Sequence, residues 1–165
     1  MLFRSLIELS EADSNVTNSL RSHFGFTEDV LNSADPKRRE LWLRRIGEKT
    51  LFGNGHSEVG DNKLQAFSTT VSSKDGQLVL NGRKYYTTGT LFADWINIAA
   101  QHENGEPVGV VVSRHSPGVE VLDDWDGFGQ ALTASGTTIF KDVPVEGNQV
   151  IPVTARFKYS NPFYQ

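Results

Sequence analysis

The pattern of apolar residues changes near residue 50, and the part of the chain after it limits the fold most strongly. From there on, short β-prone runs follow one another, separated by turn sequences and without a helix-like segment between them. The runs are 66–71, 78–80, 83–88, 95–100, 108–112, 119–122 and 137–140. Short strands at this spacing are typical of antiparallel barrels and sandwiches. We therefore expect an antiparallel β-barrel or sandwich over residues 51–151.

Turn sequences set the expected pairing of these strands. Residues 73–76 are typical of a turn, and Asn81-Gly82 is the strongest short hairpin signal in the chain. The run 83–88 is then the returning strand of that hairpin. Because side chains alternate along a strand, we expect Tyr86 and Thr88 to share one face of it.

The part before residue 50 carries the signals of helices. Asp35 followed by Pro36 is typical of a helix start, and Gly47 is typical of a helix end. The predicted fold class is therefore α+β, with a short helical segment over 1–50, the β domain over 51–151 and a tail over 152–165. The tail is rich in aromatic residues and no later element follows it, so we expect a chain cut from a longer protein.

Composition narrows the classes of function. The 165 residues include no cysteine, which excludes disulfides, thiolate metal sites and a cysteine nucleophile. The formal charge of −4 argues against nucleic acid as the main partner. No apolar run approaches the roughly 18 residues of a membrane span, and residues 1–8 lack the features of a secretory leader. We expect a cytoplasmic protein without nucleic-acid or membrane partners.

The sequence does not match the common nucleotide-binding or metal-binding motifs. The glycine-rich run 53–60 lacks both the third glycine of a dinucleotide fingerprint and the Lys-Ser/Thr of a phosphate loop. The four histidines show no metal-ligand spacing, and we interpret Asp123, Asp124 and Asp126 as a polar turn. We therefore predict no metal site.

Two segments remain as candidates for a binding site. One is the loop 52–62, where small and polar residues precede the first strand, and the other is 85–89, where tyrosines stand beside threonines. An aromatic ring beside a hydroxyl can hold a flat heteroaromatic ring by packing and hydrogen bonding. A core tyrosine and an ordinary strand threonine explain the same residues without a ligand, so the residues alone leave both interpretations open.

Four segments, in the right order, resemble the acyl-CoA dehydrogenase superfamily. They are the helix end at 47–48, Ser57-Glu58 in the place of a Thr-Glu-Pro motif, 81–89 with Ala93-Asp94 in the place of N-G-x-K-x-W-I-T-N, and the closing strands over 129–145. The chain is particularly similar to the flavin-dependent monooxygenase branch, the dibenzothiophene monooxygenase-like enzymes. Val59 in place of the motif's proline and Gly89 in place of its asparagine favour this branch over a fatty-acyl-CoA dehydrogenase.

The resemblance implies a flavin site, for FMN or FAD. By position, Thr88 corresponds to the hydroxyl residue that hydrogen-bonds the reactive edge of the flavin ring, and Tyr86 to the aromatic residue packed on that ring. Asn54 and Ser57 fall on the loop that supplies polar flavin contacts. Trp125 resembles an aromatic residue near the substrate pocket of the monooxygenase branch.

The resemblance also implies parts that these residues do not include. The family's C-terminal helical bundle, with the catalytic base and much of a tetramer interface, is expected to be missing, and so is most of the N-terminal helical domain. The parent protein would be a homotetramer, with a flavin reductase as an electron source. No catalytic residue is therefore assigned within this chain.

We expect a fragment of a flavin-dependent oxidoreductase. The parent would be monooxygenase-like and use reduced flavin and oxygen on a small organic substrate, while this chain alone would be inactive. An FAD-dependent acyl-CoA dehydrogenase that oxidises a CH–CH bond is one alternative, and a non-catalytic β-barrel binding module is the other.

Overall fold

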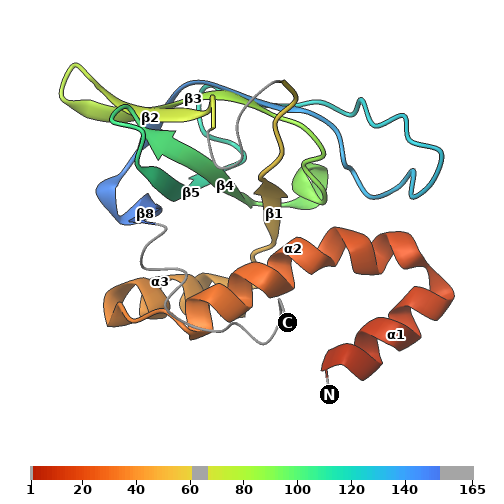
Figure 1. The fold of residues 1–165 in the computed structure, drawn as a ribbon. Helices are drawn as coiled ribbons and strands as arrows, with labels where there is room; N and C mark the ends of the chain where they lie inside the picture. Colours follow the sequence, from red (N-terminus) through yellow and green to blue (C-terminus); the bar gives the residue numbers. More distant parts are fainter. Residues whose placement is uncertain (1, 61–66, 153–165) are drawn as a thin grey trace.

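Helices lead the chain and pack against one side of a sheet (Figure 1). The computed structural model describes residues 2–60 and 67–152. The helices in these residues are α1 (Leu2–Ala12), α2 (Ser14–Leu31) and α3 (Pro36–Gly47). The carboxylate of Asp35 accepts a hydrogen bond from the Lys37 N–H at 2.9 Å and so caps α3. The helix predicted from Pro36 to Gly47 is confirmed.

Strands fill the rest of the described chain. They are β1 (Phe52–Gly55), β2 (Thr70–Lys74), β3 (Gln77–Lys84), β4 (Trp95–His102), β5 (Pro107–Ser113), β6 (Val119–Val121), β7 (Thr138–Val145) and β8 (Val150–Pro152). The short 3-10 helices η1 (Thr90–Phe92) and η2 (Gly147–Gln149) precede β4 and β8. The strand order is β6-β7-β3-β2-β4-β5-β8, with β1 beside β4. The α+β class, with helices before a mostly antiparallel sheet, is confirmed.

Within the described residues the sheet is open, which corrects the predicted barrel. Its end strands, β6 and β8, do not pair with each other. The sheet is also mixed, because β4 pairs in parallel with β1 along its first half and with β2 at its far end. Closing a barrel depends on strand tilt and on the stagger of the register. Neither quantity is contained in the spacing of apolar runs.

The predicted hairpin turn at Asn81-Gly82 is wrong, while the turn expected within 73–76 is confirmed. Asp75 and Gly76 join β2 to β3 with φ angles of 51° and 79°, as a two-residue hairpin turn requires. Asn81-Gly82 lies inside β3, where its register with β7 shifts. A Cβ on Gly82 would lie 2.5 Å from the Thr69 hydroxyl oxygen, so close strand packing explains this glycine.

Two cores hold β1 and β4 in place. Phe26 of α2, Trp42 of α3 and Phe52 of β1 form a buried aromatic core, and the Phe26 and Phe52 ring centroids lie 4.1 Å apart. Ile96 and Ile98 of β4 belong to a second, aliphatic core. β1 and β4, which lie next to the candidate segments 52–62 and 85–89 in the sequence, are therefore fixed by packing against the helices and within the sheet. None of the helices in the described part of the chain has both the length and the apolar character needed to cross a membrane.

Candidate functional site

The loop over 122–137 brings Trp125 to the residues that follow β3. This loop joins β6 to β7 and projects at the right of Figure 1. The Trp125 ring meets the Tyr86 ring edge to face, with 6.0 Å between centroids and 85° between planes. Two predicted site residues that lie 39 positions apart are therefore in contact.

A hydrogen-bond network ties Thr88 to the same loop. The Thr88 hydroxyl lies 2.8 Å from that of Ser135, and the Ser135 hydroxyl lies 2.7 Å from that of Thr133. Thr133 Oγ1 donates to the carbonyl oxygen of Gln130 at 2.9 Å. Trp125 Nε1 donates to that same carbonyl at 3.1 Å. The network thus holds Thr88 and Trp125 to one shared acceptor.

Strained backbone surrounds this network. Tyr86, Gln130 and Ala134 have φ angles of 54°, 53° and 50°, a region that residues other than glycine rarely adopt. Such strain persists only where neighbouring contacts enforce it, and it is concentrated at functional sites. The backbone therefore supports the same location as the side chains do.

The predicted strand alternation of Tyr86 and Thr88 is wrong. β3 ends at Lys84, and the left-handed conformation of Tyr86 turns the chain out of the strand. Tyr86 is 58% exposed, whereas Thr88 is only 7% exposed. Tyr86 therefore offers a ring at the surface while Thr88 lies beneath it in the polar network.

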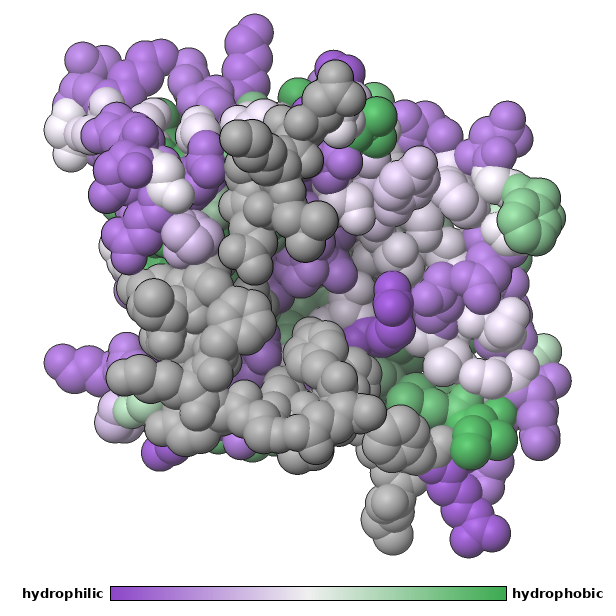
Figure 2. Space-filling model, viewed as in Figure 1, coloured by the Kyte–Doolittle hydropathy of each residue, from purple (hydrophilic) through white to green (hydrophobic). Residues whose placement is uncertain are grey.

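Apolar residues are sparse on the face seen in Figure 2, which is mostly hydrophilic outside the grey atoms. A pale green group lies at the right, over the protruding loop that follows β6, and a larger, deeper green group lies lower on the right, over α1. The exposed large apolar residues around the site are Tyr86, Phe92, Phe128 and Leu132. The site therefore presents aromatic and apolar side chains that the described chain leaves uncovered.

Ser57 is placed beside the tyrosines by a short bridge. Its carbonyl oxygen accepts a hydrogen bond from the Tyr85 N–H at 2.9 Å, while its side chain is exposed. β1, which carries Asn54, passes close to η1, because a Cβ on Gly53 would lie 2.8 Å from the Cα of Thr90. The two predicted segments, 52–62 and 85–89, therefore come together in the structure wherever their residues are described; 61–62 lie outside the described residues.

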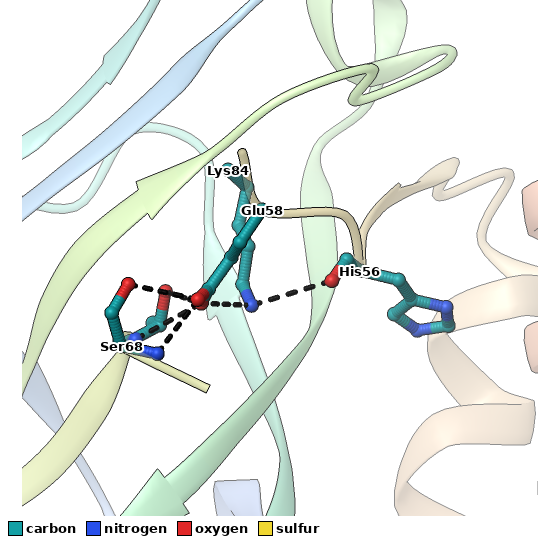
Figure 3. A network of polar contacts seen from close by, with 5 residues as sticks. His56, Glu58, Ser68 and Lys84 are labelled. Atoms are coloured by element: carbon teal, nitrogen blue, oxygen red, sulfur yellow. Dashed lines mark hydrogen bonds and ion pairs between the residues drawn. The ribbon is translucent and has the colours of Figure 1, made fainter. Parts of the chain in front are cut away.

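A buried ion pair fastens these two segments to each other (Figure 3). Lys84 Nζ lies 2.6 Å from Glu58 Oε1. The Glu58 carboxylate also accepts hydrogen bonds from the backbone N–H and hydroxyl groups of Ser68 and Thr69, at 2.6–3.0 Å. Glu58 follows Ser57 directly, and Lys84 precedes Tyr85 directly. The ion pair therefore positions both predicted segments.

Burial and hydrogen bonding act in opposite directions on the titration of this pair. Burial raises the pKa of Glu58, but the hydrogen bonds from Lys84, Ser68 and Thr69 outweigh it and bring the pKa to about 2. Burial lowers the pKa of Lys84, and Glu58 partly opposes that change. The carboxylate is thus held ionised far below neutral pH.

Buried polar atoms without partners lie where β1 and β4 run side by side. Asn54 and Asn97 are register partners on these strands. Among the described residues, neither Asn54 Oδ1 nor Asn97 Oδ1 has a hydrogen-bond partner, and the same is true of His23 Nδ1 on α2. A buried acceptor left without a partner costs about 1–3 kcal/mol. These atoms can therefore receive hydrogen bonds from a ligand.

Several residues of the site were missed by sequence reasoning. His23 stacks on Phe52 with 6.0 Å between ring centroids, and burial lowers its pKa. Thr133 and Ser135 lie within the family-like segment 129–145, and Asn97 lies within the predicted β run 95–100. The sequence assigns no role to any of the three. Their signal is spatial, because each gains its meaning from a partner far away in the chain.

One acidic residue of the loop, Asp124, stabilises the backbone. Asp124 Oδ1 accepts a hydrogen bond from the Thr137 N–H at 2.6 Å and so braces the start of β7. Within residues 2–60 and 67–152, no group of His, Asp and Glu side chains is arranged to hold a metal ion.

Helices packed on a mostly antiparallel open sheet, with aromatic and hydroxyl side chains gathered just beyond the end of β3, define an α+β protein with a candidate site for a flat ring. The profile described as "Acyl-CoA dehydrogenase, middle domain" matches residues 47–143. This match covers more than half of the chain, so the chain belongs to the acyl-CoA dehydrogenase family.

Relatives place the chain near flavin-dependent enzymes of this family. It is 30% identical over 155 residues to a dibenzothiophene monooxygenase of Mycolicibacterium goodii, covering 88% of this chain and 37% of the relative. It is 37% identical over 156 residues to the amino sugar nitrososynthase DnmZ of Streptomyces peucetius, covering 90% and 38%. The crystal structure of TdsC from Paenibacillus sp. A11-2 with FMN and indole superposes with a TM-score of 0.77 at 26% identity, covering 89% and 37%. The chain thus spans little more than a third of the length of these relatives.

Proposed function

We propose that this chain forms the flavin-facing β domain of a monooxygenase that uses reduced FMN and oxygen on a small organic substrate. The observation that carries the proposal is the convergence of Tyr86, Thr88 and Trp125 on one network around the Gln130 carbonyl. These residues are the ones that the family resemblance assigns to the flavin, for Tyr86 and Thr88, and to the substrate pocket, for Trp125.

The residues fit a flavin. Tyr86 offers an exposed ring for packing and Thr88 a hydroxyl group, while Asn54 Oδ1 is a buried acceptor without a partner in the described chain. Ser57 lies beside them through its bridge to Tyr85. When bound, the reduced flavin supplies the electrons that activate oxygen. The protein holds and orients the ring, and Trp125 would contact the substrate.

FMN is the cofactor that we favour over FAD. A relative with 26% identity was crystallised with FMN and indole. Indole is flat and apolar, and a ligand of that kind suits the edge-to-face pair of Tyr86 and Trp125. The alternative of a non-catalytic β-barrel binding module loses its barrel, because the sheet is open within residues 2–60 and 67–152.

We further propose how the chain is divided and what it works with. Residues 1–50 would be the end of a helical domain, 51–151 the flavin domain, and 152–165 a tail toward a C-terminal helical domain. Residues 153–165 lie outside the described residues. The parent protein would be a cytoplasmic homotetramer supplied by a flavin reductase, with its catalytic base in the C-terminal domain.

A titration of the purified chain with FMN and with FAD tests the proposal. We expect quenching of the flavin fluorescence with a preference for FMN, and weaker binding in Tyr86→Ala and Thr88→Val. Ile7→Ala, which removes an exposed apolar side chain from α1, is the matched control and should bind FMN as the native chain does. Absence of binding up to the solubility limit of FMN would falsify the proposed flavin site.

The acyl-CoA dehydrogenase alternative makes a different prediction. A dehydrogenase with bound FAD loses its yellow absorbance when an acyl-CoA is added without oxygen. We expect no bleaching when a longer protein containing this chain is treated in this way. Rapid bleaching would instead favour the oxidation of a CH–CH bond.

A further inference from the structure

Three buried hydroxyl groups form a chain that ends on a backbone carbonyl. Its links are Thr88 to Ser135 at 2.8 Å, Ser135 to Thr133 at 2.7 Å, and Thr133 to the Gln130 oxygen at 2.9 Å. All three side chains are buried. The three distances are those of well-formed hydrogen bonds between oxygen atoms.

Counting the hydroxyl protons fixes the direction of donation along this series of hydrogen bonds. Each link needs one proton, and the three hydroxyls supply one each. A carbonyl can only accept, so Thr133 donates to Gln130. Ser135 must then donate to Thr133, and Thr88 must donate to Ser135. The Thr88 hydroxyl therefore has no proton left to donate to a ligand.

If the Thr88 hydroxyl donated elsewhere, its hydrogen bond to Ser135 would be lost. The only other acceptor recorded for the Thr88 hydroxyl in the described chain is the Tyr86 carbonyl, at 3.4 Å. That distance is long for a bond from a hydroxyl group. The Gln130 carbonyl is also fixed from a second side, because it accepts from Trp125 Nε1 at 3.1 Å. The direction from Thr88 toward Gln130 therefore prevails.

We propose that Ser135 and Thr133 are specificity-determining residues that hold Thr88 as a hydrogen-bond acceptor only, so that the site selects a ligand presenting an N–H or O–H group to it. The inference rests on the proposed flavin site. The reactive nitrogen of the flavin ring carries a hydrogen in the reduced form and only a lone pair in the oxidised form. The hydroxyl chain therefore favours reduced FMN over oxidised FMN.

The ratio of two dissociation constants tests this inference. Equilibrium dialysis of the full chain without oxygen gives the Kd of oxidised FMN and that of FMN reduced with dithionite. In Ser135→Ala the Thr88 proton is released, and we expect the ratio of oxidised to reduced Kd to fall about tenfold. This change corresponds to about 30 mV in the two-electron potential of the bound flavin. In Thr133→Val the remaining pair can point either way, so the ratio should fall less.

Matched variants distinguish a loss of selectivity for reduced FMN from a general disturbance of the site. Thr138 is a buried threonine whose hydroxyl pairs with that of Thr87 at 2.8 Å, outside the chain of Thr88. Thr138→Val should keep the native ratio, and so should Ser135→Thr, which retains a hydroxyl. An unchanged ratio in Ser135→Ala, with flavin still bound, overturns the inference, and so does an equal fall in Thr138→Val. If neither form of FMN binds the native chain, the proposed flavin site fails first and this inference fails with it.

Discussion

Glu58 and Lys84 face each other at 2.6 Å with side chains that are 6% and 0% exposed, and their pairing joins the loop after β1 to the end of β3. Ser57, which precedes Glu58, and Tyr85, which follows Lys84, are joined by a backbone β-bridge. The candidate site is therefore built on an ion pair that takes no part in it directly. Changes to this pair should affect both stability and the site.

Removing one partner of the pair should be costly. Lys84→Met leaves the Glu58 carboxylate buried without its cation, which we expect to lower the free energy of unfolding by about 3–5 kcal/mol. The matched control is Lys74→Met, because Lys74 pairs with Asp142 at 2.7 Å with side chains that are 55% and 48% exposed. That loss should be much smaller, because exposed ion pairs contribute little to stability. Urea unfolding followed by tryptophan fluorescence measures both, and equal losses would contradict the role of burial.

Acid should weaken the fold through Glu58. Its pKa of about 2 in the folded chain lies below the ordinary 4.5, so the unfolded chain binds the proton more readily. The contribution to stability is therefore complete above about pH 4.5 and is lost as the pH falls toward 2. Urea unfolding at a series of pH values should show this loss in the native chain and a smaller one in Glu58→Gln. A parallel pair of curves would show that other carboxylates cause the loss.

A glycine of the family-like motif is required by packing. Gly89 has a φ of 77°, and a Cβ there would lie 2.5 Å from the Ser19 carbonyl oxygen of α2. Gly105 has a similar φ of 85° but open space around it. Gly105→Ala should cost only the left-handed backbone, about 1–2 kcal/mol, and Gly89→Ala clearly more. Thermal unfolding of both variants checks this, and equal changes in Tm would mean that α2 yields without cost.

The same glycine is one of the sequence features that favour the monooxygenase branch, because the dehydrogenase motif has an asparagine at this position. In the structure, α2 packs so closely on this turn that a side chain has no room. Gly89 therefore has a local packing reason in this chain, which the motif alone does not reveal.

Local signals explain most of what the sequence predicted correctly. The helix from Pro36 to Gly47 begins at its own cap, Asp35, and ends just before the left-handed Lys49, so both ends are set by neighbouring residues. The turn at Asp75-Gly76 is likewise local. Asn81-Gly82 has the same turn chemistry, but contacts with Thr69 and β7 place it within a strand. The pairing of distant strands thus overrode the stronger of two local turn signals, and it also determines that the sheet stays open in the described residues.

The residues of the candidate site also fall into those that the sequence identifies and those that only the structure identifies. Tyr86 and Thr88 could be named because a family motif marks their positions, and Trp125 because it resembles an aromatic residue near the substrate pocket of the monooxygenase branch. Thr133 and Ser135 are small polar loop residues, and nothing in their own segment shows that Thr88 lies within hydrogen-bond distance. The proton count that sets the direction of their bonds requires three-dimensional contacts.

His23 should make stability depend on pH in a range well separated from that of Glu58. Burial against Phe52 lowers its pKa below the ordinary 6.5, so the imidazole is neutral in the folded chain at pH 7. Because the unfolded chain then binds the proton more readily, stability should decline as the pH falls below about 6.5. Proton NMR should show the His23 ring titrating below its ordinary pKa. His23→Gln should flatten the stability curve between pH 7 and 5 while leaving the loss at lower pH, which belongs to Glu58. An unchanged curve in this variant would mean that the imidazole stays accessible to protons in the folded chain.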